Sequence, residues 1–448
     1  MTHRTNQRRP ENRTARPIAF VVMIVSIGVS FGQAFAQEPN FANPAEPPPA
    51  ESSAQAPSPL GDLCGLREII GKFGLTIGGS YTGEVLSNVS GGLPARGTIA
   101  EGLLELDLDL DLEKAIGLKG GSMHFSVFDS HGSSLSQRYT GDLSAVSSID
   151  AYDTFRIAEY WYEQKLFNDR LNVRIGQFLT ENEFYYSDYA NLFICGSFGA
   201  YTFLVNNFPF APAYPMSAPA IRFLLNLTPN IDLNVGIYSG STLAQATNNR
   251  GFPNIRAQDG FLCFYEIDYH VNREDISTGL PTTYKLGAIY HSLYDGELNL
   301  NPGSANRPGY GIYLTIDQAI WKQRTTDKNV RPPGLGAFCR LGYMPDDFAF
   351  VSRYIDAGLN YNGLIPGRND DIFGIGVTHS GLSGVASRRS VRAGGPRFSS
   401  ETLIEVTYTA KIFPCLTLQP DFQYIINPGA TDTAPNAAVI GIRSTLTF

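Results

Sequence analysis

Leucine and acidic residues alternate along residues 103–112, which read LLELDLDLDL. Successive side chains of an extended strand point to opposite faces, so this stretch would place leucines on one face and acids on the other. The same alternation recurs elsewhere, for example at 220–228, 231–239 and 416–426. A period of two residues is typical of strands that separate an apolar environment from water. The pattern therefore predicts an all-β protein.

Sixteen segments follow this pattern, separated by polar or glycine-rich connections. We predict strands at 73–82, 103–112, 121–129, 155–166, 171–178, 220–228, 231–239, 261–270, 284–293, 309–320, 335–344, 353–361, 371–379, 401–412, 416–426 and 437–448. An even number of strands suits a closed antiparallel outer-membrane barrel. Connections after even-numbered strands are mostly short and those after odd-numbered strands longer, as periplasmic turns and extracellular loops are in such barrels.

Some features fit this arrangement less well. The connections 271–283 and 321–334 are long for periplasmic turns. In the fourth segment, an unbroken register places Glu159 and Glu163 on the same face as Trp161 and other apolar residues. A β-bulge inserts one residue and reverses the faces beyond it, so a bulge, or a face covered by protein, would resolve the conflict.

The first 36 residues have the organisation of an export signal. Several arginines precede the apolar run at 18–29, and AFA at 34–36 fits a small-x-small cleavage site. The run is short for a membrane-spanning helix of about 20 residues, so we expect cleavage near Ala36. With no other apolar run of spanning length, a membrane-embedded mature chain has to be a barrel.

The mature chain begins with a segment of different composition. Residues 37–60 contain seven prolines, which predicts a disordered linker. Residues 61–72 could form a short helical segment at the start of a barrel domain that runs from 61 to 448. A soluble β-sandwich or β-helix would alternate in the same way. The export signal, the strand count, the loop lengths and the terminal Phe448 together favour the barrel.

Charge and cysteine content narrow the classes of function. The formal net charge is −8, and removing a signal of five arginines and one glutamate takes it to −12. A chain of this charge is a poor nucleic-acid binder, so we expect no nucleic-acid partner. The five cysteines lie far apart without a CxxC pair, and the six histidines form no HxxxH or HExxH pair. We expect no disulfide framework, metal or cofactor.

Catalytic and metal-binding motifs are absent from the sequence. Asp107 begins a D-x-D-x-D run, but a calcium loop counted from it needs Gly and Glu where Leu112 and Leu118 stand. GIGVTH at 374–379 lacks the third glycine of a dinucleotide fingerprint, and GLSG at 381–384 is no nucleophile elbow. The sequence therefore predicts a protein that is not an enzyme.

Longer motifs along the chain match a known family. They include LDLDLDLEKAIGLKGG at 106–121, EYWYEQKLFNDRLNVRIGQF at 159–178, DAGLNYNGLIPGRNDDIFGIGV at 356–377 and LTLQPDFQYIINPG at 416–429. Together they resemble the carbohydrate-selective porins of the OprB family, over about residues 61–448. The resemblance implies a sixteen-stranded outer-membrane channel that admits glucose and related small sugars by passive diffusion, without energy coupling.

The barrel and the resemblance imply partners and leave alternatives open. We expect small neutral sugars, outer-membrane lipid, and an assembly machinery that reads the C-terminal strand ending in Phe448. The barrel could be a monomer or a homotrimer. A general or anion-preferring porin of the same fold is the alternative function. An energised transporter would need a plug domain, for which residues 37–72 are too few, and a structural or adhesive barrel is a further class.

Charged residues on the lumen face are the candidate site. Acids and arginines suit a neutral sugar, because each binds hydroxyl groups while their charges balance. The candidate wall residues are Asp107, Asp109, Arg174, Arg222, Asp232, Glu405 and Arg443. The long loop 179–219 is expected to fold inward and narrow the pore, with Phe184, Tyr185 and Tyr186 stacking on sugar rings. Each wall residue could instead be a solvated residue away from the constriction, and each aromatic residue could pack the loop.

Overall fold

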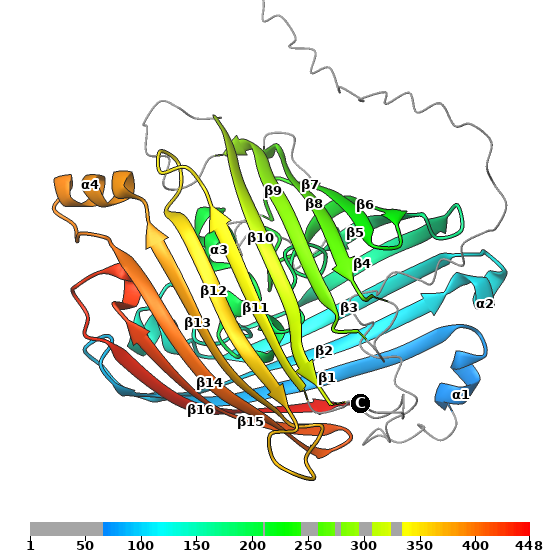
Figure 1. The fold of residues 1–448 in the computed structure, drawn as a ribbon, viewed down its shortest axis with the longest axis horizontal. Coiled ribbons are helices and arrows are strands. Elements are labelled where there is room, and N and C mark those ends of the chain that lie inside the picture. The colour runs from blue at the N-terminus through cyan, green and yellow to red at the C-terminus, as the bar shows by residue number, and fades with distance from the viewer. Residues whose placement is uncertain (1–65, 209–210, 243–258, 274–278, 295–306, 324–333) are drawn as a thin grey trace, which may run out of the picture. The chain divides into compact units, whose positions relative to one another are not determined.

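The computed structural model describes residues 66–208, 211–242, 259–273, 279–294, 307–323 and 334–448 (Figure 1). The predicted signal and linker, and residues 61–65 of the predicted helical segment, lie outside these ranges. Four short α-helices lie within them: α1 (Leu66–Gly71), α2 (Leu112–Ile116), α3 (Thr202–Asn207) and α4 (Gly384–Arg392). None of the described helices is long and apolar enough to cross a membrane.

Sixteen antiparallel strands close into one barrel, with each strand paired to its neighbours in sequence and β1 paired to β16. They are β1 (Leu75–Ser90), β2 (Thr98–Asp111), β3 (Gly121–Gly132), β4 (Thr154–Leu166), β5 (Leu171–Phe178), β6 (Ala218–Thr228), β7 (Ile231–Ser239), β8 (Phe261–Val271), β9 (Thr282–Tyr294), β10 (Arg307–Lys322), β11 (Gly334–Tyr343), β12 (Val351–Asn362), β13 (Ile372–Leu382), β14 (Ser400–Phe413), β15 (Leu416–Ile426) and β16 (Ala437–Thr447). All sixteen predicted strands are confirmed. The largest boundary difference is in β1, which continues eight residues past Thr82.

The alternation along β2 sets which face meets lipid. Leu106 and Leu108 are exposed on the outer face, while Glu105 on the inner face accepts a hydrogen bond from Ser80 of β1 at 3.1 Å. This confirms the predicted faces over most of the run. The end was predicted wrongly, because Leu112 is not a lipid-facing strand residue but the first residue of α2. The carboxylate of Asp111 caps this helix by accepting the N–H groups of its first turn.

A bulge in β4 resolves the register conflict noted in the sequence. The pairing of β3 with β4 shifts between Phe125 and Val127, so that two consecutive residues of β4, Ala158 and Glu159, both face the barrel interior. Beyond the bulge, Trp161 also faces inward. Of the two explanations that the sequence left open, the bulge is therefore present, and it carries the acidic residues of β4 to the lumen side.

The lengths of the connections assign the two ends of the barrel. Residues 167–170, 229–230 and 414–415 form tight turns at one end, whereas 133–153 and 179–217 form long loops at the other. Short turns are periplasmic and long loops extracellular in barrels of this type. Figure 1 shows α1, α2 and the C-terminus at the end with the short turns and α4 at the opposite end. Most of the two long connections noted above, β8 to β9 and β10 to β11, lies outside the described residues.

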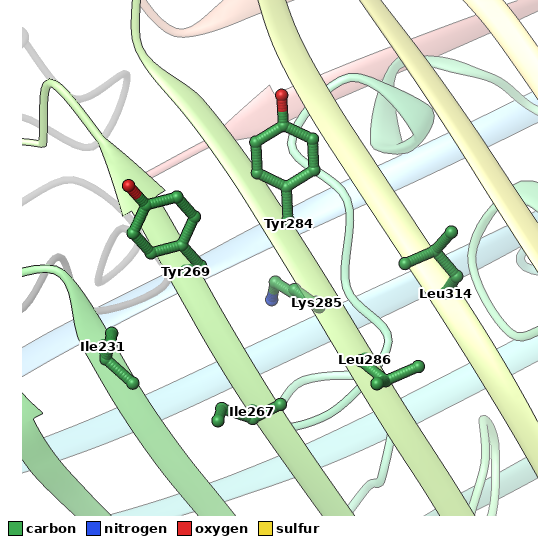
Figure 2. A pocket seen from close by; sticks show the side chains of 7 residues that line it. All are labelled: Ile231, Ile267, Tyr269, Tyr284, Lys285, Leu286 and Leu314. Atoms are coloured by element: carbon green, nitrogen blue, oxygen red, sulfur yellow. The ribbon is translucent and has the colours of Figure 1, made fainter.

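The outer face carries a shallow apolar groove near the periplasmic end, with a volume of about 230 Å³ (Figure 2). Its lining includes Ile231 of β7, Ile267 of β8, Leu286 of β9 and Leu314 of β10. The rings of Tyr269 and Tyr284 stack beside it with 6.3 Å between centroids. Paired tyrosines at this level are typical of the aromatic girdle where a barrel leaves the hydrocarbon. The groove therefore belongs to the lipid-facing surface.

Candidate functional site

The loop 179–217, here called the second inward loop, crosses the barrel interior. The N–H of Tyr185 donates to Glu266 of β8 at 2.8 Å, and the N–H groups of Ile194 and Cys195 donate to Glu405 of β14 at 2.6 and 2.9 Å. Both glutamates are fully buried on the inner face, on strands far apart around the barrel. The prediction that this loop folds inward is confirmed.

A buried arginine fixes the middle of the second inward loop. Arg340 of β11 donates from Nε to both carboxylate oxygens of Asp356 on β12, at 3.0 Å each, and from Nη2 to the carbonyl of Ser197 in the loop at 3.1 Å. Its guanidinium lies 4.2 Å from the ring centroid of Tyr201. The side chains of Arg340 and Asp356 are fully buried. Such a pair holds its geometry firmly, because either partner alone would be an uncompensated buried charge.

The loop 133–153, here called the first inward loop, packs against the second. Glu401 of β14 accepts the N–H groups of Leu143 and Ser144 at 2.8 and 2.9 Å. The N–H of Ser148 donates to the carbonyl of Ile194 at 2.7 Å, which joins the two loops directly. The anchors named so far lie on β8, β11 and β14, and Glu159 of β4 also holds the second inward loop by accepting the N–H of Leu179 at 2.8 Å.

Charged and aromatic side chains form a row on the inner face of β2 to β5. Nδ1 of His124 lies 2.7 Å from the carboxylate of Asp109, and Nε2 lies 3.9 Å from that of Asp107. The histidine ring stacks on Trp161, with 5.1 Å between centroids. From the other flank, the guanidinium of Arg174 lies 3.7 Å from the indole centroid. Stacking on both flanks fixes the polar atoms of the row at the lumen surface.

Two arginines and two glutamates meet where the second inward loop touches this wall. Arg174 Nε donates to Glu163 of β4 at 2.8 Å, and another guanidinium nitrogen pairs with Glu183 of the loop. Arg222 Nε donates to Glu183 at 2.7 Å, and its Nη2 lies 3.3 Å from Glu163. Each arginine thus contacts both glutamates. Groups of opposite sign held this way offer hydrogen-bond donors and acceptors together without a net charge.

Exposure separates the residues that meet the lumen from those behind them. The side chains of Asp109 and Asp107 are 55% and 36% exposed, and that of Arg174 is 14% exposed. The side chains of Glu163 and Glu183 are 4% exposed and largely buried beneath it. The two aspartates are therefore the most accessible charged groups of this row, and the two glutamates orient Arg174.

A family comparison identifies the kind of channel. The family model described as "Carbohydrate-selective porin, OprB family" matches residues 95–448. The chain belongs to this family. It is therefore an outer-membrane porin of the carbohydrate-selective class, a channel through which sugars diffuse. Porins are not enzymes in general, in agreement with the class expected from the sequence.

Individual relatives extend along almost the whole porin. Porin B of Pseudomonas aeruginosa is 26% identical over 442 residues, which cover 89% of this chain and 94% of that protein. The putative porin QuiX of Acinetobacter baylyi is 21% identical over 423 residues, which cover 87% of this chain and 92% of that protein. The high-pH structure of Pseudomonas putida OprB superposes with a TM-score of 0.76 at 23% identity, covering 88% of this chain and 99% of that one. At that identity the superposition shows a shared fold.

Several predicted site residues of the porin serve as anchors. Glu405 is fully buried, since both of its oxygens accept loop N–H groups, so it does not line the open lumen as expected. Arg443 pairs with Glu84 of β1 and donates to Ser148 of the first inward loop at 2.9 Å. Asp232 pairs with Arg273 near the periplasmic end. Glu405 and Arg443 depart from the sequence prediction because charges on the inner wall also hold the loops, whereas Asp232 is buried in its pairs with Arg273 and His270.

The loop aromatics also depart from the prediction. Phe184 and Tyr185 are fully buried and pack with Phe264, Tyr238 and other aromatic residues of the wall, so neither ring is free to stack on a sugar. Tyr186 is half-buried, and the ammonium of Lys285 lies 5.7 Å from its ring centroid. Of the three predicted rings, only Tyr186 keeps a partly open surface.

The sequence prediction missed the side chains that complete the site. Glu163 was set aside because its register conflicts with an unbroken strand, and Glu183 lies in a loop without periodicity. His124 and Trp161 carry no motif of their own. Applying the β4 bulge would have brought Glu163 and Trp161 onto the face of Arg174. No comparable signal exists for Glu183.

Two loop carboxyls have raised pKa values. Burial raises the pKa of Glu181 to about 7, with the N–H of Tyr214 opposing the shift and Glu159 adding to it. Burial likewise raises the pKa of Asp150 in the first inward loop to about 6, against a hydrogen bond from Ser134. Glu181 accepts the N–H of Tyr214 within the second inward loop, and Asp150 accepts the hydroxyl of Ser134 within the first, so these shifts bear on contacts inside each loop.

Proposed function

We propose that the channel selects neutral monosaccharides and small oligosaccharides of the glucose type. The observation that carries this proposal is the charge-balanced cluster of Arg174, Arg222, Glu163 and Glu183 beside exposed aspartates. A sugar that enters a narrow pore loses hydrogen bonds to water, and paired carboxylates and guanidinium groups replace them. A neutral polyhydroxyl solute gains from both signs of charge, whereas an ion gains from one and is repelled by the other.

In this proposal the residues divide into two roles. Asp107, Asp109 and Arg174 contact the sugar, and His124, whose two ring nitrogens face the aspartates, orients their carboxylates. The cluster partners Glu163, Glu183 and Arg222 keep Arg174 extended across Trp161. The binding has to be weak, because a solute that is held tightly would block the pore instead of crossing it.

The charge distribution argues against the alternative of an anion-preferring porin. The two most exposed charged groups of the row are the carboxylates of Asp107 and Asp109, and His124 lies between them. The arginines of the cluster are each neutralised by two glutamates. Small ions would therefore meet a weakly cation-favouring wall.

The proposal includes maturation and assembly. Residues 1–36 are removed on export near Ala36, residues 37–60 act as a linker, and residues 61–448 form the porin domain. The aromatic C-terminus at Phe448 is the recognition feature for barrel assembly in the outer-membrane lipid. Support comes from the signal-like sequence and from β16, whose neighbours in the closed barrel are β15 and β1.

Liposome swelling tests the proposed selectivity. Vesicles containing the porin are placed in isotonic glucose, a neutral amino acid of similar size, and gluconate as the anionic counterpart. We expect wild type to swell fastest in glucose. The double variant Asp109→Asn/Arg174→Gln should swell more slowly in glucose and at an unchanged rate in the other two solutes. The matched control is Arg96→Gln, an exposed arginine in the extracellular connection between β1 and β2. Equal rates for all three solutes would reject the proposal.

A further inference from the structure

A cluster of arginines occupies the extracellular rim of the barrel around α4. This helix lies in the connection from β13 to β14, residues 383–399, which contains Arg388, Arg389, Arg392 and Arg397 and no acidic residue. Arg388, Arg392 and Arg397 are exposed. Four positive charges in one short loop are unusual on a chain whose formal net charge is −8.

The helix is held rigidly, so these charges have defined positions. The Ser383 hydroxyl caps α4 by accepting the N–H groups of Val385 and Ala386 at 3.1 and 3.2 Å, and it donates to the carbonyl of Asp346 at 2.6 Å. Ser387 in the helix donates to the carbonyl of Phe398 at 2.8 Å, which ties the end of the loop back to the helix. The basic residues therefore project from a fixed element.

A fifth arginine continues the cluster down the lipid-facing side. Arg353 of β12 lies opposite Tyr343 of β11 and Gly381 of β13 in the sheet register. Tyr343 and Ile355 are exposed on the outer face, so Arg353, two residues before Ile355, points outward as well. Its side chain is exposed near the extracellular end of the strand, at the level where lipid head groups begin.

Among the described residues, four arginines of this rim are not paired with an acidic side chain. In the part of the chain that the structure describes, Arg353, Arg388, Arg392 and Arg397 form no ion pair. The acidic residues close by are Asp346, whose carboxylate accepts the N–H of Gly384 at 3.3 Å, the exposed Asp347, and the exposed Asp432 beside Thr431, which forms a β-bridge with Phe398. Five arginines against these three aspartates leave a formal excess of two positive charges in the rim.

We propose that this rim, Arg353 with Arg388, Arg389, Arg392 and Arg397, binds the phosphate groups of the glycolipid in the outer leaflet around the barrel. Guanidinium groups bind phosphate oxygens in pairs with matching geometry, and clusters of basic residues at a membrane surface bind anionic head groups. Arg353 lies on the lipid-facing side of the barrel, where it can contact a lipid head group. A soluble anion bound to the loop would not need a contact there. The occupant is therefore a lipid head group beside the barrel, distinct from any solute in the pore.

Binding of purified lipid A to the porin in detergent micelles tests this proposal. Lipid A carrying two phosphates is titrated against wild type, Arg388→Gln/Arg392→Gln, and Arg353→Gln. The matched control, Arg96→Gln/Lys119→Gln, removes two exposed positive charges outside the rim. We expect the dissociation constant to rise roughly tenfold or more for the double rim variant, several-fold for Arg353→Gln, and to change little for the control.

Further measurements test whether the bound phosphate belongs to a lipid and whether the variants are folded. Dephosphorylated lipid A should bind all forms equally weakly, and inorganic phosphate at the same concentration should not displace lipid A. Unchanged sugar swelling and heat-dependent gel mobility would show that the rim variants keep the folded channel. Equal affinity of the rim variants and the control, or displacement by inorganic phosphate alone, would overturn the proposal.

Discussion

Glu183 of the second inward loop and Arg222 of β6 form a buried ion pair, with 2.7 Å between Oε2 and Nε. The pair joins the second inward loop to a strand of the barrel wall. The same carboxylate group also pairs with Arg174, the most exposed member of the cluster. The ion pair thus ties the second inward loop to the wall and orients a side chain at the lumen.

Removing the charge of Glu183 is expected to change ion selectivity. In Glu183→Gln, Arg174 and Arg222 share one carboxylate instead of two, so the local potential becomes more positive. The reversal potential in a KCl gradient should then shift toward that of chloride. Glu113→Gln, an exposed change in α2 at the periplasmic end, is the control and should leave it unchanged. A shift toward the potassium potential would contradict the assigned role of the cluster.

The Arg340 and Asp356 pair is expected to decide whether the second inward loop stays attached. Arg340→Met leaves the Asp356 carboxylate buried without its partner, a change that costs about 3–5 kcal/mol. Protease cleavage within 179–217 and single-channel conductance should both rise. The double variant Arg340→Met/Asp356→Leu removes both charges and should recover much of the loss. If the single and double variants behave alike, the pair is not the anchor.

The raised pKa of Glu181 predicts a pH dependence of loop stability. A carboxyl that is protonated up to about pH 7 in the folded state, and only to about 4.5 in the unfolded state, stabilises the fold at low pH. That contribution is lost as the pH rises through this window and does not change further above it. The melting temperature should therefore fall less between pH 5 and pH 8 in Glu181→Gln than in wild type. If the melting temperatures of wild type and Glu181→Gln fall by the same amount over this pH range, other groups cause the pH dependence.

The alternation in β2 predicts a sharp difference between adjacent substitutions. Leu108→Arg places a charge on the lipid face and should cost up to about 2–4 kcal/mol near the bilayer midplane. Asp107→Asn changes the lumen face and should have little effect on folding. Urea unfolding of the porin in lipid vesicles measures both free energies. Similar losses for the two variants would contradict the assigned faces.

The strands were predictable because each has to meet lipid and water on opposite faces. Leu106 and Leu108 cannot exchange faces with Asp107 and Asp109 without placing carboxylates in hydrocarbon. The same reasoning located Arg174 and Arg222 on the lumen side. It failed at Leu112, where the capping carboxylate of Asp111 ends the strand and starts a helix.

The roles of the lumen charges were harder to predict, since a period of two identifies a face but not a partner. Glu405 and Asp109 follow the same pattern, yet Glu405 accepts two N–H groups from the second inward loop and Asp109 is half exposed. Phe184 and Tyr185 are aromatic residues of an inward loop, and only the packing of that loop shows that their rings are buried. Loop contacts come from tertiary structure, which alternation does not encode.

Sugar-dependent block of single-channel current tests the central claim most directly. One wild-type porin in a planar bilayer at neutral pH is titrated with glucose, a larger oligosaccharide, and a neutral solute without hydroxyl groups. The account predicts brief, concentration-dependent interruptions of current with the sugars, weakened by Asp109→Asn and Arg174→Gln and retained in Arg96→Gln. An open current that no sugar interrupts, or interruptions that these two substitutions leave unchanged, would contradict it.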